Sequence, residues 1–228
     1  MAVMRTWSSM KKSNELIPAS QNGDLIDEIG DQSNYSVTLS GSSESYCIGL
    51  VDIVNSTRIV ANLPQNKVCG YFEIFLNSLS KVIERFGGVV IKNVGDSLLF
   101  TFPNMGKTSS KFGFMSCLEC SLSLIEERPL INKILVKEGL PTLNYRVSAD
   151  YGSVVTMKSN KSSSIDVIGS PVNMCTKINR MAAVNGIIIG GDLYEMVKDL
   201  DDYYFKPADD YSIGLKNSYP VYSVRRKN

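Results

Sequence analysis

The sequence predicts an α+β fold of the ferredoxin-like, split βαβ type, with a central, mostly antiparallel sheet flanked by helices. Three observations lead to this prediction. Short apolar runs alternate with longer segments of helical periodicity, the order of the first elements is β-α-β-β-α-β, and a tight turn joins the second and third strands. Further helices and strands follow this unit.

The first half of the unit is well marked. Residues 46–53 form an apolar run of the length of a buried strand. After Pro64, large apolar residues recur at helical spacing until the Gly-Gly pair at 87–88 ends the helix. Two β-rich runs then flank the Gly-Asp dipeptide at 95–96, which predicts a hairpin with its turn at that dipeptide.

The second half follows the same logic. Long apolar-periodic segments predict helices, and short β-rich runs predict strands. The predicted elements are a helical region at 109–127 that resumes after Pro129, a strand at 145–157 interrupted at Asp150 and Gly152, a polar loop at 158–164, a helix at 170–183, a strand at 186–190, a helix at 193–200, and strands around Tyr204 and Tyr222.

The composition divides the chain into two parts. Residues 1–44 are rich in Ser, Asn, Asp and Gly, and we expect a flexible N-terminal tail or arm, with a short helix at most at 14–29. Residues 45–228 are expected to form one folded domain.

Charge and composition exclude several classes of function. The net charge is +1, so nothing favours nucleic acid or a membrane surface as a partner. No apolar run approaches the ~18 residues of a membrane span, and the N-terminus lacks the apolar core of a signal peptide, so we expect a cytoplasmic protein. The five cysteines are scattered, as expected of reduced, buried thiols. Histidine is absent, which excludes histidine general bases and most zinc sites.

Two acids follow strands that would be neighbours in this topology. Asp52 comes at the end of the first strand, and Asp96 lies in the hairpin turn. Taken singly, Asp52 is explained as a helix cap and Asp96 as a turn residue. Taken together, two converging carboxylates without histidine favour a hard cation, Mg²⁺ or Mn²⁺, with substrate phosphates completing its coordination. A helix start after Asp52 would offer N–H groups to phosphate.

Four segments of the sequence resemble the class III nucleotidyl cyclase catalytic domain, the family of adenylyl and guanylyl cyclases. They are LVDIVNST, IKNVGDSLLFTF, YRVSADYGSVV and DVIGSPVNMCTKIN, in the family's order and at similar spacing. The resemblance covers roughly residues 45–225. It implies the cyclase fold and a reaction that forms a cyclic nucleotide.

The resemblance also implies roles for individual residues near the first strand. Asp52 and Asp96 match the two metal carboxylates, and Ile53 matches the residue whose carbonyl is a further ligand of two Mg²⁺ or Mn²⁺ ions. Ser56 and Thr57 match the positions whose backbone faces the β- and γ-phosphates.

Two further matches concern the base. Lys92 and Asp166 stand where adenylyl cyclases carry the lysine and acid that read adenine, whereas guanylyl cyclases usually have Glu and Cys there. A lysine donates to a ring nitrogen and a carboxylate accepts from the exocyclic amine, so this pair favours ATP. Guanine would present a carbonyl to the carboxylate, and unpaired buried polar groups are costly. The plainer alternative is that Lys92 is a solvated strand residue and Asp166 a loop acid.

The last matches lie in the last quarter of the chain. Asn173 matches the asparagine that orients the ribose. Lys177, four residues later, replaces the family's usual arginine, and a lysine point charge holds phosphate less well than an arginine fork. Arg180 lies elsewhere on the helix and is not counted as a replacement. Lys216 resembles a phosphate-contacting lysine, although its spacing is a residue short.

The sequence therefore predicts an adenylyl cyclase that converts ATP to 3′,5′-cyclic AMP and pyrophosphate by two-metal catalysis, in signal transduction. In the family, metal ligands and base-reading residues come from different chains, which implies a homodimer with shared active sites. The alternative is a catalytically weak or inactive cyclase-like domain that binds nucleotide as a sensing or interaction module. A guanylyl cyclase is the less favoured third reading.

Overall fold

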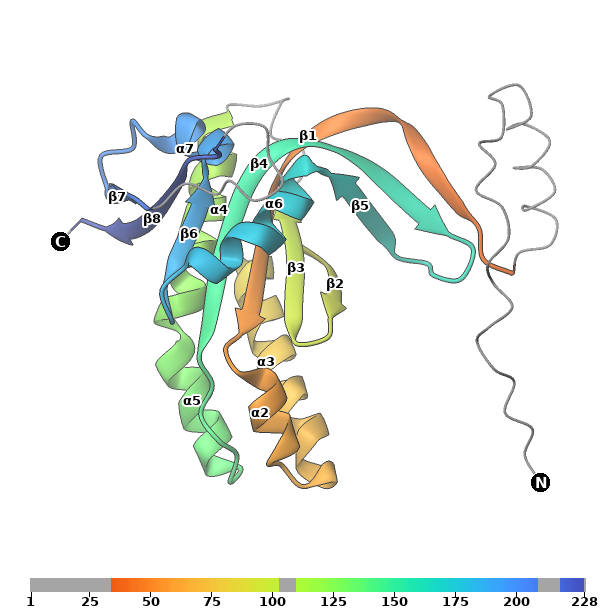
Figure 1. Ribbon diagram of the computed structural model, residues 1–228, viewed down its shortest axis with the longest axis vertical. Coiled ribbons are helices and arrows are strands. Elements are labelled where there is room, and N and C mark those ends of the chain that lie inside the picture. Colours follow the sequence, from red (N-terminus) through yellow and green to blue (C-terminus); the bar gives the residue numbers. More distant parts are fainter. Residues whose placement is uncertain (1–33, 103–109, 209–217, 228) are drawn as a thin grey trace, which may run out of the picture.

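The molecule is built on one central sheet with helices on both faces (Figure 1). The structure, a computed structural model, describes residues 34–102, 110–208 and 218–227. Within these residues the sheet has eight strands in the order β2-β3-β1-β4-β6-β8-β7, and β5 pairs with the outer part of β4. Every neighbouring pair is antiparallel except β4 and β6. The predicted mostly antiparallel α+β sheet is confirmed.

The elements alternate along the chain much as the sequence predicts. The strands are β1 (Val37–Ile53), β2 (Val89–Val94), β3 (Ser97–Phe102), β4 (Tyr145–Ser159), β5 (Ile165–Gly169), β6 (Ile187–Gly190), β7 (Tyr203–Pro207) and β8 (Val221–Arg226). The helices are α2 (Ser56–Ala61), α3 (Gln65–Arg85), α4 (Ser110–Glu126), α5 (Arg128–Lys137), α6 (Ser170–Ile178), the short 3₁₀ helix η2 (Asn179–Met181) and α7 (Gly191–Val197).

Three predictions of local structure were wrong. The first strand begins at Val37, nine residues before the predicted start at position 46, because its serine-rich first half pairs with β4 and satisfies its backbone there. β4 runs through Asp150 and Gly152 without a break. Strand β5 was not predicted, since its five residues follow a polar loop and pair only with the outer part of β4. The helix expected at 14–29 lies outside the described residues.

The two faces of the sheet are covered differently. Successive β1 residues alternate between them, as a strand requires. Cys47 and Val51 join the main core with α3, α4, α5 and α7, while Ile48 and Leu50 face a smaller cluster that includes Cys175 of α6. One face therefore carries most of the hydrophobic core, and α6 covers the smaller cluster on the other (Figure 1).

An arm projects from the sheet (Figure 1). The first half of β1 and the second half of β4 continue together beyond the helices, in register from Val37–Ser159 inward, with a bulge between Leu39 and Ser43. β5 pairs with this outer part of β4. The arm carries the residues 165–169 back toward the sheet edge formed by β2, which matters for the site described below.

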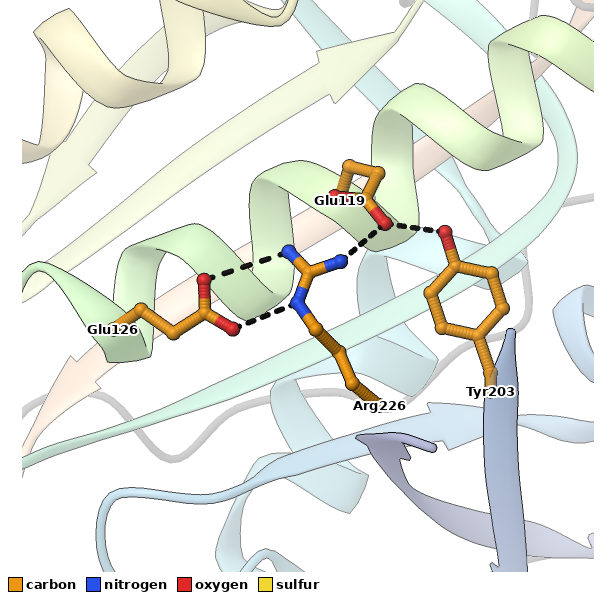
Figure 2. Close-up of polar contacts among 4 residues, drawn as sticks. All are labelled: Glu119, Glu126, Tyr203 and Arg226. Carbon is orange, nitrogen blue, oxygen red and sulfur yellow. Dashed lines mark hydrogen bonds and ion pairs between the residues drawn. The ribbon is translucent and has the colours of Figure 1, made fainter. Parts of the chain in front are cut away.

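The opposite edge of the sheet is tied to the helix layer by ion pairs (Figure 2). Arg226 of β8 donates from Nη1 to Glu119 (2.6 Å) and from Nε to Glu126 (2.8 Å), both on α4. The Tyr203 hydroxyl of β7 also donates to Glu119. The hydrogen bond from Arg226 lowers the pKa of the Glu119 carboxyl. The edge strand β7 and its neighbour β8 are thereby both fixed to α4.

Within the described ranges, no helix is long and apolar enough to cross a membrane.

Candidate active site

The two predicted metal carboxylates meet at one end of the sheet. Asp52 is the penultimate residue of β1, and the antiparallel register places it opposite Ser97, the first residue of β3. Asp96 directly precedes Ser97 in the β2–β3 turn, where Gly95 has the positive φ (61°) that the tight turn requires. The Ser97 hydroxyl donates a hydrogen bond to the Asp52 carboxylate. Strand register, and not loop flexibility, therefore brings the two acids together.

The electrostatics of Asp52 reflect this crowding. Burial raises the pKa of the Asp52 carboxyl above its ordinary value, and the nearby charge of Asp96 raises it further. The Ser97 hydrogen bond opposes this, as do the positive charges of Arg146 and Arg180. A half-buried carboxylate next to a second acid is an arrangement that a cation would stabilise.

The donor set fits a hard divalent cation. Among the described residues, no group of three or more His, Cys, Asp or Glu side chains could hold a metal ion. Two carboxylates alone suit Mg²⁺ or Mn²⁺, which keep positions open for water and substrate phosphates, better than zinc, which takes three or four protein ligands. Ile53 is the last residue of β1 and its side chain is buried, so only its backbone is available to such a site.

The predicted helix start after Asp52 is confirmed. Asn55 adopts a left-handed conformation (φ 59°), and Ser56 and Thr57 are the first two residues of α2. The Val54 N–H donates to the carbonyl of Asn144 (2.8 Å), which ties this turn to the segment before β4. The contact of Ser56 and Thr57 with phosphate stays a prediction.

The two predicted base-reading residues lie together. Lys92 of β2 and Asp166 of β5 form an ion pair, although 74 residues separate them in the sequence. Their side chains are 44% and 24% exposed, so the pair is open to solvent. The second Asp166 oxygen accepts from the Val167 N–H (2.8 Å), which orients the carboxylate. A pocket of about 190 Å³ adjoins the pair, and its lining includes Tyr35, Met157 and Ser164.

The two predicted ribose and phosphate residues share one exposed helix face. Asn173 and Lys177 are one turn apart on α6 and both are exposed, whereas Cys175 and Ile178 are buried against the sheet. Pro171 lies in the first turn of α6, where its missing N–H is harmless. Lys216 lies outside the described residues.

One chain gathers the predicted residues into separate groups. Asp52 and Asp96 form the first group, and Lys92 with Asp166 the second. The charges that act most strongly on Asp52 are Asp96, Arg146 and Arg180, and neither Lys92 nor Lys177 is among them.

Three residues beside the metal carboxylates were not predicted. Ser97 could have been found from the hairpin, because the first residue after the turn faces the end of β1. Arg146 pairs with Asp52 across β1 and β4, a register that the sequence alone does not give. Its guanidinium also donates to the Ala182 carbonyl (2.9 Å) and so links β4 to the end of η2. Arg180 lies in η2, off the face of Asn173 and Lys177, yet its charge reaches Asp52.

The comparisons with known proteins identify the family. The family model described as the adenylate and guanylate cyclase catalytic domain matches residues 39–225. The chain therefore belongs to the class III nucleotidyl cyclases. It is 22% identical over 142 residues to an adenylate cyclase of Streptomyces coelicolor. That match covers 62% of this chain and 31% of the relative, so the chain spans about a third of the relative's length.

Solved structures support the same fold. The adenylyl cyclase CyaB from P. aeruginosa superposes with a TM-score of 0.74 at 16% identity, covering 85% of this chain and 97% of that one. The guanylyl cyclase Cya2 superposes with a TM-score of 0.71 at 21% identity, and the match covers 81% of this chain and 93% of Cya2. A dimeric guanylyl cyclase domain from the fungus Blastocladiella emersonii superposes with a TM-score of 0.69 at 17% identity. That match covers 82% of this chain and 100% of the fungal domain. Adenylyl and guanylyl cyclases both occur among these structures, so the likeness defines the fold and not the base.

Proposed function

We propose that the protein is an adenylyl cyclase that converts ATP to 3′,5′-cyclic AMP and pyrophosphate. The observation that carries this proposal is the Lys92–Asp166 pair, which brings a donor and an acceptor for adenine to one point of the chain. The alternative that Lys92 is a solvated residue and Asp166 a loop acid does not explain why β5 returns to β2 at this pair. The cytoplasmic location expected from the sequence is part of the same proposal.

The metal site of the proposal uses residues at the end of β1 and in the β2–β3 turn. Asp52, Asp96 and the Ile53 carbonyl would hold two Mg²⁺ or Mn²⁺ ions. When bound, these ions would supply the charge that activates the ribose 3′-hydroxyl and balances the leaving pyrophosphate. Ser97 keeps the Asp52 carboxylate oriented through its hydrogen bond. Ser56 and Thr57 would offer their backbone to the β- and γ-phosphates at the start of α2.

The remaining residues orient the nucleotide and stabilise developing charge. Lys92 would donate to a ring nitrogen of adenine while Asp166 accepts from the exocyclic amine. Asn173 would hold the ribose, and Lys177, one turn later on the same exposed face, would place its ammonium against the α-phosphate as charge builds there. Lys216 would contact phosphate.

The separation of these groups in one chain supports a homodimer in which each active site takes metal ligands from one subunit and nucleotide-orienting residues from the other. The domain of B. emersonii, similar in fold, is dimeric. In this arrangement a variant with a defective metal side and one with a defective α6 would complement each other. A mixture of Asp52→Ala and Asn173→Ala chains is therefore expected to recover roughly a quarter of wild-type activity, since half of the dimers would carry one intact site.

A single assay tests the chemistry. Purified protein is incubated with ATP or GTP, each with Mg²⁺ or Mn²⁺, and the products are identified by mass spectrometry. Cyclic AMP formed from ATP, and lost in Asp52→Ala, is the expected result. Cyclic GMP as the main product would overturn the adenine assignment.

A nucleotide-binding module without turnover is the second candidate, and Lys177 is the residue that favours it, because a lysine replaces the arginine fork. Bound ATP with no cyclic product under any of these conditions would support it. The first residue to restore would then be arginine at position 177.

A further inference from the structure

A cleft of about 470 Å³ lies between α2 and the loop that precedes β4. None of the described residues assigned to the nucleotide or the metals lines it. Its volume falls in the range of roughly 300–1,000 Å³ that is typical of sites for small organic ligands. The cleft is open to solvent on one side, so a ligand could enter without any movement of the fold.

One part of the cleft is apolar. Val54, Ile59 and Leu63 contribute half-buried aliphatic side chains, and Pro141 adds the face of its ring from the opposite wall. Ile59 and Leu63 also pack against the main core, which fixes their positions. A rigid aliphatic floor of this kind favours a ligand with an apolar body.

Other residues that line the cleft offer hydrogen-bond donors. The Asn144 Oδ1 accepts from Arg128 (3.1 Å) and from the Asn185 side chain (2.9 Å), which turns the Asn144 amide nitrogen away from both. Within the described part of the chain, that nitrogen has no acceptor, and the side chains of Asn55 and Thr142 make no hydrogen bond. Three polar groups thus line the same cleft without a hydrogen-bond partner among the residues that the structure describes.

The charge of the cleft is of one sign. Arg58 is the only charged residue among the described residues that line it, and none of these is an acid. In the described ranges, Arg58 forms no ion pair; its backbone carbonyl accepts from the Asn62 side chain (2.7 Å), but its guanidinium is exposed and without a carboxylate. An unpaired guanidinium beside amide donors is complementary to a carboxylate or a phosphate monoester.

We propose that this cleft is a binding site for a small organic anion with an apolar body. The carboxylate or phosphate of the ligand lies on Arg58 and the donors of Thr142 and Asn144, and its apolar part lies on Ile59 and Leu63. This assignment is independent of the cyclase activity, because the cleft shares no residue with the proposed nucleotide site. It does adjoin that site through Val54, which follows Ile53 directly.

Protein-observed NMR with three small ligands that share a phenyl ring tests the proposal. Benzoate and phenyl phosphate carry the two anionic groups on a common ring, and benzyl alcohol is the neutral control. We expect both anions to shift the backbone amides of residues 54–63 and 142–144, with at least one of them binding about tenfold more tightly than benzyl alcohol, as one charge-assisted hydrogen bond allows. The stronger of the two anions identifies the headgroup.

Arg58→Gln separates the anion site from general apolar binding. Because Arg58 is exposed, the substitution leaves the core intact, and it is expected to reduce anion affinity about tenfold, to the level of benzyl alcohol. Lys81→Gln, an exposed cation of α3 outside the cleft, is the matched control and should change nothing. Equal binding of all three ligands, unchanged affinity in Arg58→Gln, or shifts confined to other segments would each overturn the proposal.

Discussion

The two charged pairs of the candidate site differ in how the isolated chain accommodates them. Asp52 and Asp96 carry like charges, and the charge of Asp96 adds to the burial that raises the pKa of Asp52. Lys92 and Asp166 carry opposite charges and already satisfy each other. Arg146 and Arg180 offset the first pair only in part, since the pKa of Asp52 is still raised, whereas the second pair is neutralised and would have to open to bind the proposed base.

This difference indicates what each pair needs from a ligand. Two neighbouring carboxylates destabilise the folded chain, so a purely structural role would be served better by neutral residues. The Lys92–Asp166 pair is partly exposed, and opening such a pair costs roughly 0–1 kcal/mol, far less than the binding free energy of a nucleotide. Ion pairing in the free chain is therefore compatible with base recognition.

The largest effect is expected from neutralising the like-charged pair. Asp52→Asn should reduce cyclic nucleotide formation by about 10³-fold or more, because it removes a carboxylate that is proposed to hold the catalytic cations. In metal-free buffer the variant should unfold at the same temperature as the wild type or higher, since a repulsion has been removed. Product analysis and thermal unfolding measure the two effects.

Thermal unfolding with added Mn²⁺ tests whether Asp52 binds a metal ion. Mn²⁺ should raise the unfolding temperature of the wild type, which binds it when folded, and should not raise that of Asp52→Asn. Asp201→Asn, at an exposed acid remote from the site, is the control and should behave as the wild type. Retained activity in Asp52→Asn would remove Asp52 from the catalytic site.

The second effect tests the oppositely charged pair. Replacing the pair by Lys92→Glu together with Asp166→Cys should lower the ratio of kcat/KM for ATP to that for GTP by about 10²-fold, because a hydrogen-bonded base site strongly rejects a base whose edge it cannot match. The ratio is measured by competition between the two nucleotides. An unchanged ratio would show that adenine is read elsewhere.

The fold could be predicted further from the sequence than the site could. Helix α3 and the β2–β3 hairpin follow from periodicity and glycine placement, both of which are local signals. The convergence of Asp52 and Asp96 also followed, because the split βαβ order makes β1 and β3 neighbours. The arm did not follow, since the start of β1 is stabilised by pairing with a strand more than a hundred residues away.

The surroundings of Asp52 were beyond sequence reasoning for the same reason. Arg146 faces Asp52 only through the register of β1 and β4. Arg180 reaches it because Asn179 anchors η2 to the sheet through its side-chain bond to Ser148 (3.1 Å). Such contacts depend on packing between distant segments, which neither periodicity nor motif spacing encodes. The roles of all the predicted site residues, Asp52, Asp96, Lys92 and Asp166 included, stay predictions.

A third, smaller effect concerns Lys177, the cation proposed to face the α-phosphate. Lys177→Arg is expected to raise kcat about tenfold with little change in KM, because the arginine fork would bind the phosphate better as charge develops there. Lys177→Gln should lower kcat by a similar factor. Steady-state kinetics with ATP measure both. Equal kcat values for all three proteins would mean that position 177 does not touch the reacting phosphate.

The last prediction concerns a third carboxylate, Asp150, which is buried, and among the described residues no cation is one of the main influences on its pKa. It is 2% exposed and accepts hydrogen bonds from the Tyr219 hydroxyl (3.0 Å) and the Tyr151 N–H (2.9 Å). It also packs so closely on Gly190 that a Cβ added at that position would lie 2.4 Å from the Asp150 carboxyl group. Burial raises its pKa to about 7. Asp150 is therefore held largely protonated in the folded protein below neutral pH.

The pH dependence of stability distinguishes this buried acid from the metal pair. The ordinary pKa of an aspartate is 3.8, and the pKa of Asp150 in the folded protein is about 7. Between pH 4 and pH 7 the folded state therefore retains a proton at Asp150 that the unfolded state releases. The free energy of unfolding from this group should therefore fall as pH rises, by at most about 1.4 kcal/mol per pH unit, and level off above pH 7. Urea unfolding of the wild type and of Asp150→Asn across this range isolates the contribution, because every other carboxylate is common to both. As pH rises, the free energy of unfolding of the wild type should fall relative to that of Asp150→Asn. A difference that stays constant with pH would mean that Asp150 is already ionised in the folded protein and that its hydrogen bonds outweigh its burial.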